Sequence, residues 1–153
     1  MSIEMKVKSL AFDPSSNGFA VLLSDLEETQ TLPIRVEPLE ANAIALKTKN
    51  IHLHRPMTHD LIRNILKVFD AEVVKVELTD VKESTFDAVI HIGKHGDEMA
   101  VEARPSDAIT LAIVEKAPIY VTEEVIRKAK TIELDRLEEW LEALEPEDFK
   151  YTA

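Results

Sequence analysis

The stretch Glu102-Ala103-Arg104-Pro105-Ser106-Asp107-Ala108-Ile109, written EARPSDAI, decides how this chain folds. A strand-like segment, Glu98–Ala103, precedes the proline, and an almost wholly apolar segment, TLAIV, follows the stretch. Proline fits the first turn of a helix, where a backbone N–H has no helical partner. The stretch therefore predicts a strand that turns directly into a buried helix over Ser106–Glu115, with charged and hydroxyl side chains at the joint.

A second joint of this kind lies earlier in the chain. When the sequence is shifted by 67 residues and laid on itself, six identities occur across 37 ungapped positions. The identical pairs are Asp13 and Asp80, Phe19 and Phe86, Pro38 and Pro105, Ala41 and Ala108, Ala45 and Ala112, and Lys49 and Lys116. EPLEA (Glu37–Ala41) and RPSDA (Arg104–Ala108) then become equivalent strand-to-helix joints. We expect an internal duplication; the alternative is that any two units of this architecture share apolar positions.

Alternating and helical periodicities outline the elements of each half. Expected strands run to about Phe12 and over Phe19–Leu23, Thr31–Val36, Glu72–Thr79, Thr85–Ile92, Glu98–Ala103 and Ile119–Val121. Expected helices cover Leu39–Lys47, a segment from a Thr58 N-cap to Phe69, Ser106–Glu115 and a segment from a Thr122 cap to about Lys130. Pro33 suggests an edge strand or a bulge, and Lys94–Asp97 suggests a hairpin turn.

These elements predict an α+β fold of two related strand-rich halves, with apolar helices packed on mixed sheets. The expected unit is a β-β-β-α-α pseudo-repeat, over about 5–69 and 72–130. Residues 1–130 would form one domain, and 131–153 would add an acidic amphipathic helix and tail. The apolar stripe of that last helix is Leu134, Leu137, Trp140, Leu141 and Leu144.

Composition excludes several kinds of protein. The 153 residues contain no cysteine, which excludes disulfides, thiolate nucleophiles and thiolate zinc sites. The N-terminus shows no signal-peptide pattern, and no apolar run approaches membrane-spanning length. We therefore expect a cytoplasmic protein with no membrane partner.

Charge is unevenly distributed along the chain. The net charge is −11, which disfavours phosphate backbones, and residues 131–153 alone contribute −6. The stretch Lys47–Lys67, however, contains five basic residues and one acidic residue, which gives it a net charge of +4. The candidate nucleic-acid-binding residues are these bases, Lys47, Lys49, Arg55, Arg63 and Lys67. The alternative is an ordinary solvated basic face.

The joints carry the candidate catalytic groups. No glycine-flanked serine elbow and no phosphate-cradling glycine loop is present, so an enzyme would rely on metal-assisted or acid–base hydrolysis. Ser106 and Asp107 either cap a buried helix or belong to a site. A pseudo-twofold would bring Glu40 near Asp107, and such a carboxylate pair could hold a divalent cation of unspecified identity. Arg104 either forms a salt bridge to Glu102 or Asp107, or binds phosphate.

His59 and Asp60 form another candidate pair. Both are expected at a helix N-terminus, where a carboxylate is favoured and an imidazolium is disfavoured. A neutral His59 could act as a base or a ligand. The alternative is that Asp60 only stabilises the helix end and His59 is merely exposed.

Three motifs resemble the bifunctional nuclease domain family: HRPMTHDLIRNIL (His54–Leu66), EARPSDAITLAI (Glu102–Ile113) and APIYVTEEVI (Ala117–Ile126). They stand in family-like order and spacing, and the resemblance covers roughly Phe19–Lys130. It implies an α+β domain, usually self-associating, with members credited with cleaving DNA and RNA. Two segments depart from the family pattern. Ile34-Arg35-Val36-Glu37 replaces Ile-Trp-Ile-Gly, and Thr85-Phe86-Asp87-Ala88 replaces Thr-Phe-Tyr-Ala, so two aromatic positions are lost.

Two functions are compatible with these features: a nuclease, or a non-enzymatic interaction or regulatory module whose polar joints are structural. In either case we expect a homo-oligomer, most simply a twofold dimer. The helix Ala108–Val114 has Thr110 as its one polar residue and needs cover on all sides, and we do not expect a domain of this size to cover two such alanine-rich helices alone.

Overall fold

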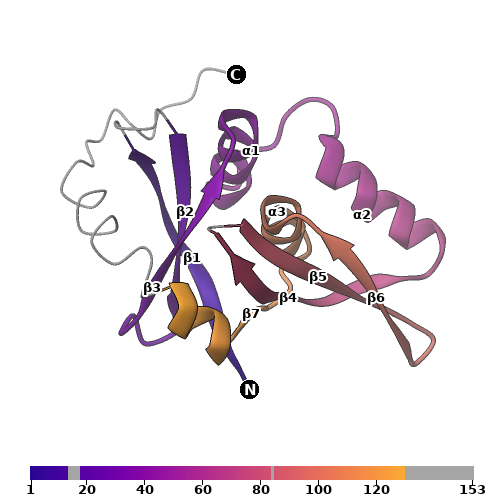
Figure 1. The fold of residues 1–153 in the computed structure, drawn as a ribbon. Helices are drawn as coiled ribbons and strands as arrows, with labels where there is room; N and C mark the ends of the chain where they lie inside the picture. The colour runs from indigo at the N-terminus through magenta and orange to yellow at the C-terminus, as the bar shows by residue number, and fades with distance from the viewer. Residues whose placement is uncertain (14–17, 84, 130–153) are drawn as a thin grey trace.

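The computed structural model describes residues 1–13, 18–83 and 85–129, and all structural statements below concern these. A seven-stranded sheet forms the frame, in the order β3-β2-β1-β7-β4-β5-β6 (Figure 1). Neighbouring strands are antiparallel except β4 and β7, which are parallel. The strands are β1 (Ser2–Asp13), β2 (Gly18–Asp25), β3 (Thr31–Val36), β4 (Glu72–Lys82), β5 (Thr85–Lys94), β6 (Asp97–Ala103) and β7 (Ile119–Thr122). The predicted α+β class with a mixed sheet is confirmed.

Two antiparallel three-stranded units make up most of the sheet, and each leads into a helix. β1–β3 lead into α1 (Pro38–Thr48), and β4–β6 lead into α3 (Pro105–Glu115). β7 joins the units by pairing with β1 on one side and β4 on the other. The second half has this extra strand before its final helical turns at 123–129, whereas a loop connects α1 to α2 (Thr58–Val68). The shared β-β-β-α order fits a duplication, and superposition of the halves stays a prediction.

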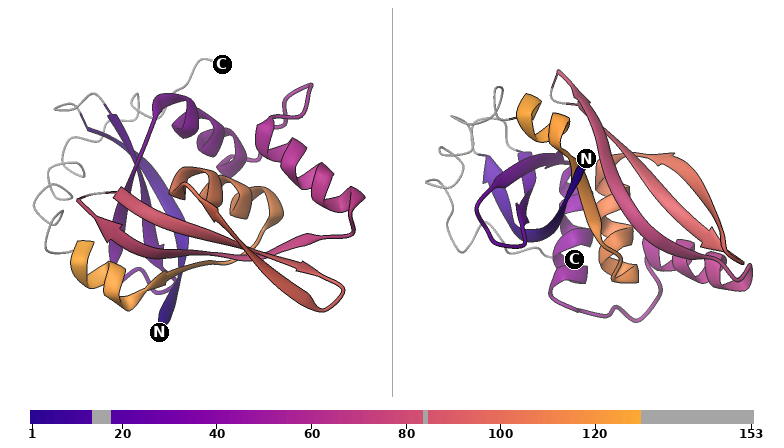
Figure 2. Two further views of the ribbon diagram at one scale, coloured as in Figure 1. Left: turned by 45° about the vertical axis from the view of Figure 1, so that its right-hand side comes forward. Right: turned by 90° about the horizontal axis from the view of Figure 1, so that it is seen from below.

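The helices build the core against the sheet. α1 and α3 pack side by side, and α2 lies next to α3 (Figure 2). Ala108, Ile109, Leu111 and Ala112 of α3 are at most 2% exposed, because α1, α2 and strands β3–β5 surround the helix. The chain therefore covers this helix by itself, and the expectation that α3 needs a partner molecule was wrong. Any self-association must use another surface.

Local expectations are mostly confirmed, with one correction. Pro33 does lie on an edge strand, β3, and the β5–β6 hairpin turns through His95 and Gly96, both at positive φ. Thr122 accepts the backbone N–H of Val125 at 3.2 Å, as expected of a cap. The N-cap of α2, however, is Met57 and not Thr58.

Asp60 explains this shift of the helix start by one residue. Its carboxylate, three residues into the helix, accepts the Met57 backbone N–H at 2.9 Å. The helix start is thus satisfied from within α2, without the Thr58 hydroxyl. The expected helix around Leu134–Leu144 lies outside the described residues. Among the helices that the structure does describe, none has the length and apolar character needed to cross a membrane.

Candidate functional site

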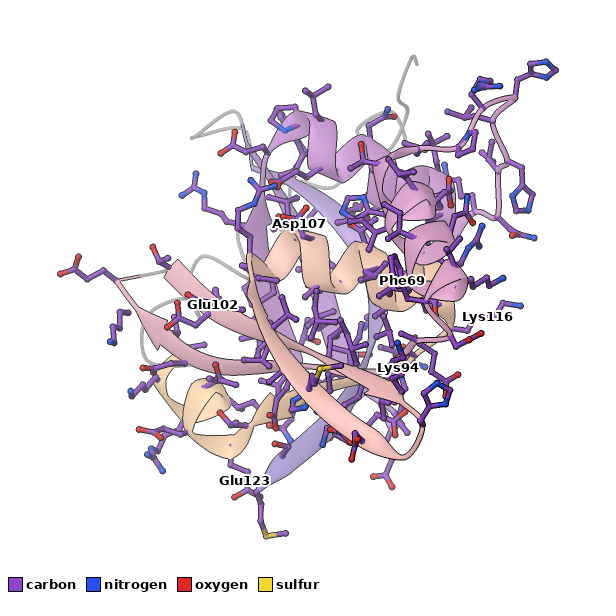
Figure 3. All side chains as sticks on the ribbon, turned by 90° about the vertical axis from the view of Figure 1, so that its right-hand side faces the viewer. Phe69, Lys94, Glu102, Asp107, Lys116 and Glu123 are labelled. Carbon is purple, nitrogen blue, oxygen red and sulfur yellow. The ribbon has the colours of Figure 1, made fainter. Side chains whose placement is uncertain are left out.

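The first turns of α1, α2 and α3 bring five polar side chains together. Arg104 lies at the centre: its Nη2 is 2.9 Å from Glu40 Oε2, and its Nε is 2.9 Å from Asp107 Oδ2. Ser106 Oγ donates to Glu40 Oε2 at 2.5 Å, and His59 Nε2 lies 3.1 Å from Asp107 Oδ1. We call these five residues the polar cluster. They come from both halves of the chain, and Figure 3 labels Asp107 at the start of α3, below α1 and beside α2.

The two carboxylates of the polar cluster have different local roles. Glu40 Oε1 accepts the backbone N–H of Glu37 at 2.8 Å, so Glu40 caps α1 while its other oxygen binds Arg104 and Ser106. Asp107 directs both oxygens to side chains, those of Arg104 and His59. The sequence raised a capping role for Ser106 and Asp107. In the structure Glu40 makes such a contact at the start of α1, whereas Asp107 links α3 to α2.

Asp107 remains ionised at neutral pH. Partial burial raises the pKa of its carboxyl, but the hydrogen bonds and charges of Arg104 and His59 outweigh this and hold the pKa below its ordinary value. An ionised carboxylate only accepts hydrogen bonds, so the proton shared with His59 is on Nε2. In the neutral ring, Nδ1 of His59 then carries a lone pair. Its side chain is 14% exposed.

Arg104 pairs with carboxylates on both sides. The hydrogen bond to Asp107 and the charges of Asp107 and Glu40 raise the pKa of its guanidinium above an already high value, so Arg104 is always charged. Of the two salt-bridge partners proposed from the sequence, the structure shows Asp107. The side chain is still 65% exposed. Because a guanidinium carries five N–H donors, part of the group stays available to an anion.

A cleft of about 710 Å³ opens beside the polar cluster. Glu40, Arg104 and Ser106 lie in its wall. The remaining lining residues are Arg35, Val36, Glu37, Thr85, Phe86, Asp87, Glu102, Ala103 and Pro105. Both segments that depart from the family pattern, Ile34–Glu37 and Thr85–Ala88, thus line the same cleft. With four carboxylates and two guanidiniums, the cleft is acidic.

A second hollow, of about 590 Å³, is basic. Four bases line it, Lys47, Arg55, Arg63 and Lys116, together with His52, His54 and one acid, Asp60. We call it the basic groove. Lys116, at the end of α3, was not among the residues selected from the sequence. The 67-residue register does align it with Lys49 and could have pointed to it.

The five bases selected from the sequence do not lie together in the structure. Lys47, Arg55 and Arg63 line the basic groove, but Lys49 does not, and Lys67 lines a different hollow among five acids. Lys47 is itself committed to an ion pair, with its Nζ 2.6 Å from Asp60 Oδ2. Burial raises the pKa of the Asp60 carboxyl. The hydrogen bonds from Lys47 and the Met57 N–H, with the charge of Lys47, lower it by more, so the pKa lies below its ordinary value. Two neighbouring residues of α2 therefore belong to different sites. His59 lies in the polar cluster, and Asp60 lines the basic groove.

The geometry of the polar cluster also bears on the predicted cation site. Glu40 and Asp107, proposed as a carboxylate pair, both face the guanidinium of Arg104. Across 1–13, 18–83 and 85–129, no three His, Asp or Glu side chains are grouped so that they could hold a metal ion as they stand. A divalent cation bound by Glu40 and Asp107 would therefore have to compete with Arg104.

Comparison with known proteins agrees with the motifs. Residues 21–133 match the model of the bifunctional nuclease domain. Uncharacterized protein Rv1829 of Mycobacterium tuberculosis is 30% identical over 165 residues, spanning 97% of this chain and 99% of that protein. Bifunctional nuclease 2 of Oryza sativa is 26% identical over 106 residues, 67% of this chain and 33% of the rice protein. Bifunctional nuclease 2 of Arabidopsis thaliana is 28% identical over 93 residues, 59% of this chain and 28% of the other. The chain belongs to the bifunctional nuclease domain family.

Proposed function

We propose that this protein is a nuclease that hydrolyses phosphodiester bonds, with the polar cluster as its catalytic site and the basic groove as its contact to the nucleic-acid strand. The observation that carries the proposal is the chain of contacts from His59 through Asp107 to Arg104. It places a potential proton acceptor and an anion-binding group on the two sides of one carboxylate. Family membership supports the same activity.

His59 is the proposed general base. Asp107 holds the ring with Nε2 protonated, so Nδ1 can take a proton from a water molecule. The water oxygen then attacks phosphorus, and the bond from phosphorus to the leaving oxygen breaks. Protonation of the leaving oxygen, by solvent or by the imidazolium, completes the balance.

Arg104 is the proposed phosphate ligand. In-line attack accumulates negative charge on the phosphoryl oxygens, and a guanidinium stabilises that charge. Arg104 is held by Glu40 and Asp107 but remains largely exposed, so it can meet phosphate without a large rearrangement. The acids of the cleft would repel the rest of a polyanion, which is why we place the strand on the basic groove.

The proposed reaction can proceed with or without a divalent cation bound in the cleft. Glu37, Glu40, Asp87 and Glu102 supply carboxylate oxygens around the cleft, the ligand type that Mg²⁺ and Mn²⁺ prefer. The proposed steps use only His59 and Arg104, so comparing cleavage in EDTA with cleavage in added Mg²⁺ or Mn²⁺ decides whether a cation takes part.

A second candidate function is a non-enzymatic interaction module. It is favoured by the pairing within the polar cluster, where Arg104 is neutralised by two carboxylates of the same chain. In this reading the contacts only fix α1, α2 and α3 to one another.

One assay separates the two candidates. Purified protein is incubated with labelled single-stranded DNA, double-stranded DNA and RNA, with EDTA or with added Mg²⁺ or Mn²⁺. His59→Asn should lower cleavage by roughly 10²–10⁴-fold, the usual contribution of a general base. His91→Asn is the matched control, because His91 is similarly covered and also contacts a carboxylate, Glu98. Absence of cleavage by the wild-type protein in every arm, or equal activity of the two variants, would sink the nuclease proposal.

A further inference from the structure

The basic groove contains three cations that the chain itself leaves unpaired. Lys47 is held by both oxygens of Asp60, at 2.7 and 2.6 Å, so these two charges cancel. The other three bases of the groove, Arg55, Arg63 and Lys116, form no ion pair with any residue that the structure describes. The groove therefore holds a local excess of positive charge in a chain whose net charge is −11.

Arg63 also has an unused hydrogen-bond donor. Its Nε is buried and finds no acceptor among the described residues, an arrangement that is costly to a folded protein. The nearby carboxylate of Asp60 is already occupied by Lys47 and by the backbone N–H of Met57. Because Arg63 lines the groove, turning its guanidinium toward an anion bound there would satisfy this donor.

The groove is a recess with walls on several sides. Its lining comes from the end of α1, the loop at 50–56, the first half of α2 and the end of α3, and it is more enclosed than the acidic cleft. Asn50 and Asn64 add neutral amide donors to the wall. A recess of this kind accepts the end of a strand more readily than a strand that must enter and leave again.

We propose that the basic groove binds the terminal phosphate monoester of a nucleic-acid strand. A terminal monoester carries a charge of about −1.5 to −2 and three strong acceptor oxygens, whereas an internal diester carries a single charge. Three unpaired cations and an unused donor match the monoester better. This inference rests on the proposed function, in which the groove contacts the strand, and it adds which part of the strand the groove holds. Either a 5′-phosphate or a 3′-phosphate has this chemistry.

The position of the groove on α2 predicts where such a strand would be cut. His59 and Arg63 are four residues apart, so they lie on one face of the helix about one turn, roughly 5.4 Å, from each other. A nucleic-acid strand rises about 3.4 Å per nucleotide in a duplex. A terminal phosphate on Arg63 therefore brings the first or second linkage to His59. Cleavage should remove one or two nucleotides from a phosphorylated end.

Fluorescence anisotropy tests the site without relying on cleavage. Full-length His59→Asn protein is used, because it keeps the groove and leaves the strand intact. The ligands are single-stranded DNAs of one sequence, labelled internally, with a 5′-phosphate, a 3′-phosphate or hydroxyls at both ends. One phosphorylated strand should bind roughly 10–100-fold more tightly than the hydroxyl strand, which is the usual effect of a hydrogen bond to a charged group. The strand that binds more tightly identifies the end.

Substitutions in the groove test the assignment of the residues. Arg63→Gln should bring the ratio of the two affinities close to one. Arg55→Gln and Lys116→Gln should each lower it, and since both side chains are exposed, neither change should disturb folding. Lys49→Gln is the matched control, because Lys49 is an exposed lysine outside the groove. A groove that only contacts internal phosphates would lose affinity for all three strands alike.

The outcomes separate this inference from the nuclease proposal. If wild-type protein cleaves no strand while the affinity ratio holds, the nuclease proposal fails and the terminal-phosphate site stands. If both hold, gel electrophoresis should show products shortened by one or two nucleotides from the phosphorylated end. Equal affinities for the three strands, a ratio that survives all three groove variants, or an equal fall in Lys49→Gln would each overturn the terminal-phosphate site.

Discussion

His59 of α2 and Asp107 of α3 lie 3.1 Å apart, although 48 residues separate them in the chain. The contact joins two separate parts of the sequence, because His59 comes from the basic stretch Lys47–Lys67 and Asp107 comes from EARPSDAI. It makes Asp107 the residue on which the catalytic and the structural readings differ most.

Asp107→Asn should separate these readings. The amide keeps the shape of the side chain but no longer holds His59 in one tautomer or neutralises Arg104. We expect cleavage to fall by roughly 10²–10⁴-fold and the free energy of unfolding to fall by only about 1 kcal/mol, since the group is partly exposed. Nuclease assays and urea unfolding measure the two effects. Asp80→Asn is the control: Asp80 is 32% exposed and Asp107 35%, and Asp80 is paired with Lys128 away from the cluster.

The Lys47–Asp60 ion pair should contribute to stability. The two side chains are 11% and 13% exposed, so removing either one leaves the other charge nearly buried. Lys47→Met or Asp60→Asn should each cost roughly 2–3 kcal/mol, and the double variant should cost clearly less than the sum. Urea unfolding of the four proteins gives the coupling energy. Additive losses would contradict a direct interaction.

Acid should destabilise the protein through Asp60 and Asp107. Both carboxyls have pKa values below their ordinary values, so the folded state holds the unprotonated form more strongly than the unfolded chain does. Their contribution is complete above the unfolded pKa of roughly 4 and is lost as the pH falls through the lower, folded pKa. Unfolding free energy measured between pH 7 and pH 2 should therefore drop below about pH 4. Asp60→Asn should make this drop shallower; an unchanged slope would contradict the assignment.

Nucleic-acid binding should depend on the bases that line the basic groove, and not on those that are merely close to them in the sequence. Arg55→Gln, Arg63→Gln and Lys116→Gln each remove a base that lines the groove. Each should weaken binding and reduce the salt slope by about 0.7–0.9. Lys49→Gln and Lys67→Gln, which lie outside it, should change binding little. Fluorescence anisotropy across a salt series measures both quantities, and a larger effect of the Lys49 and Lys67 variants would refute this placement.

Local structure followed from the sequence because its causes are local. Alternation of apolar residues marked the strands, Pro33 marked an edge, and Pro105 marked the start of α3. The Thr58 cap failed for a reason that is also local, since Asp60 satisfies the helix start from inside. The equivalence of the joints at Pro38 and Pro105 correctly suggested that Glu40 and Asp107 would approach one another, and Arg104 now connects them.

What the sequence by itself determined is the order and kind of the elements and the residue types gathered at the two joints. Only the tertiary structure decided that His59 contacts Asp107, that Lys47 is taken up by Asp60, and that Lys116 replaces Lys49 and Lys67 at the groove. It also decided that α3 is covered by its own chain while α2 is not. The physical reason is that helix and strand patterns depend on neighbours a few residues away, whereas ion pairing and burial depend on which surfaces meet when the helices pack on the sheet.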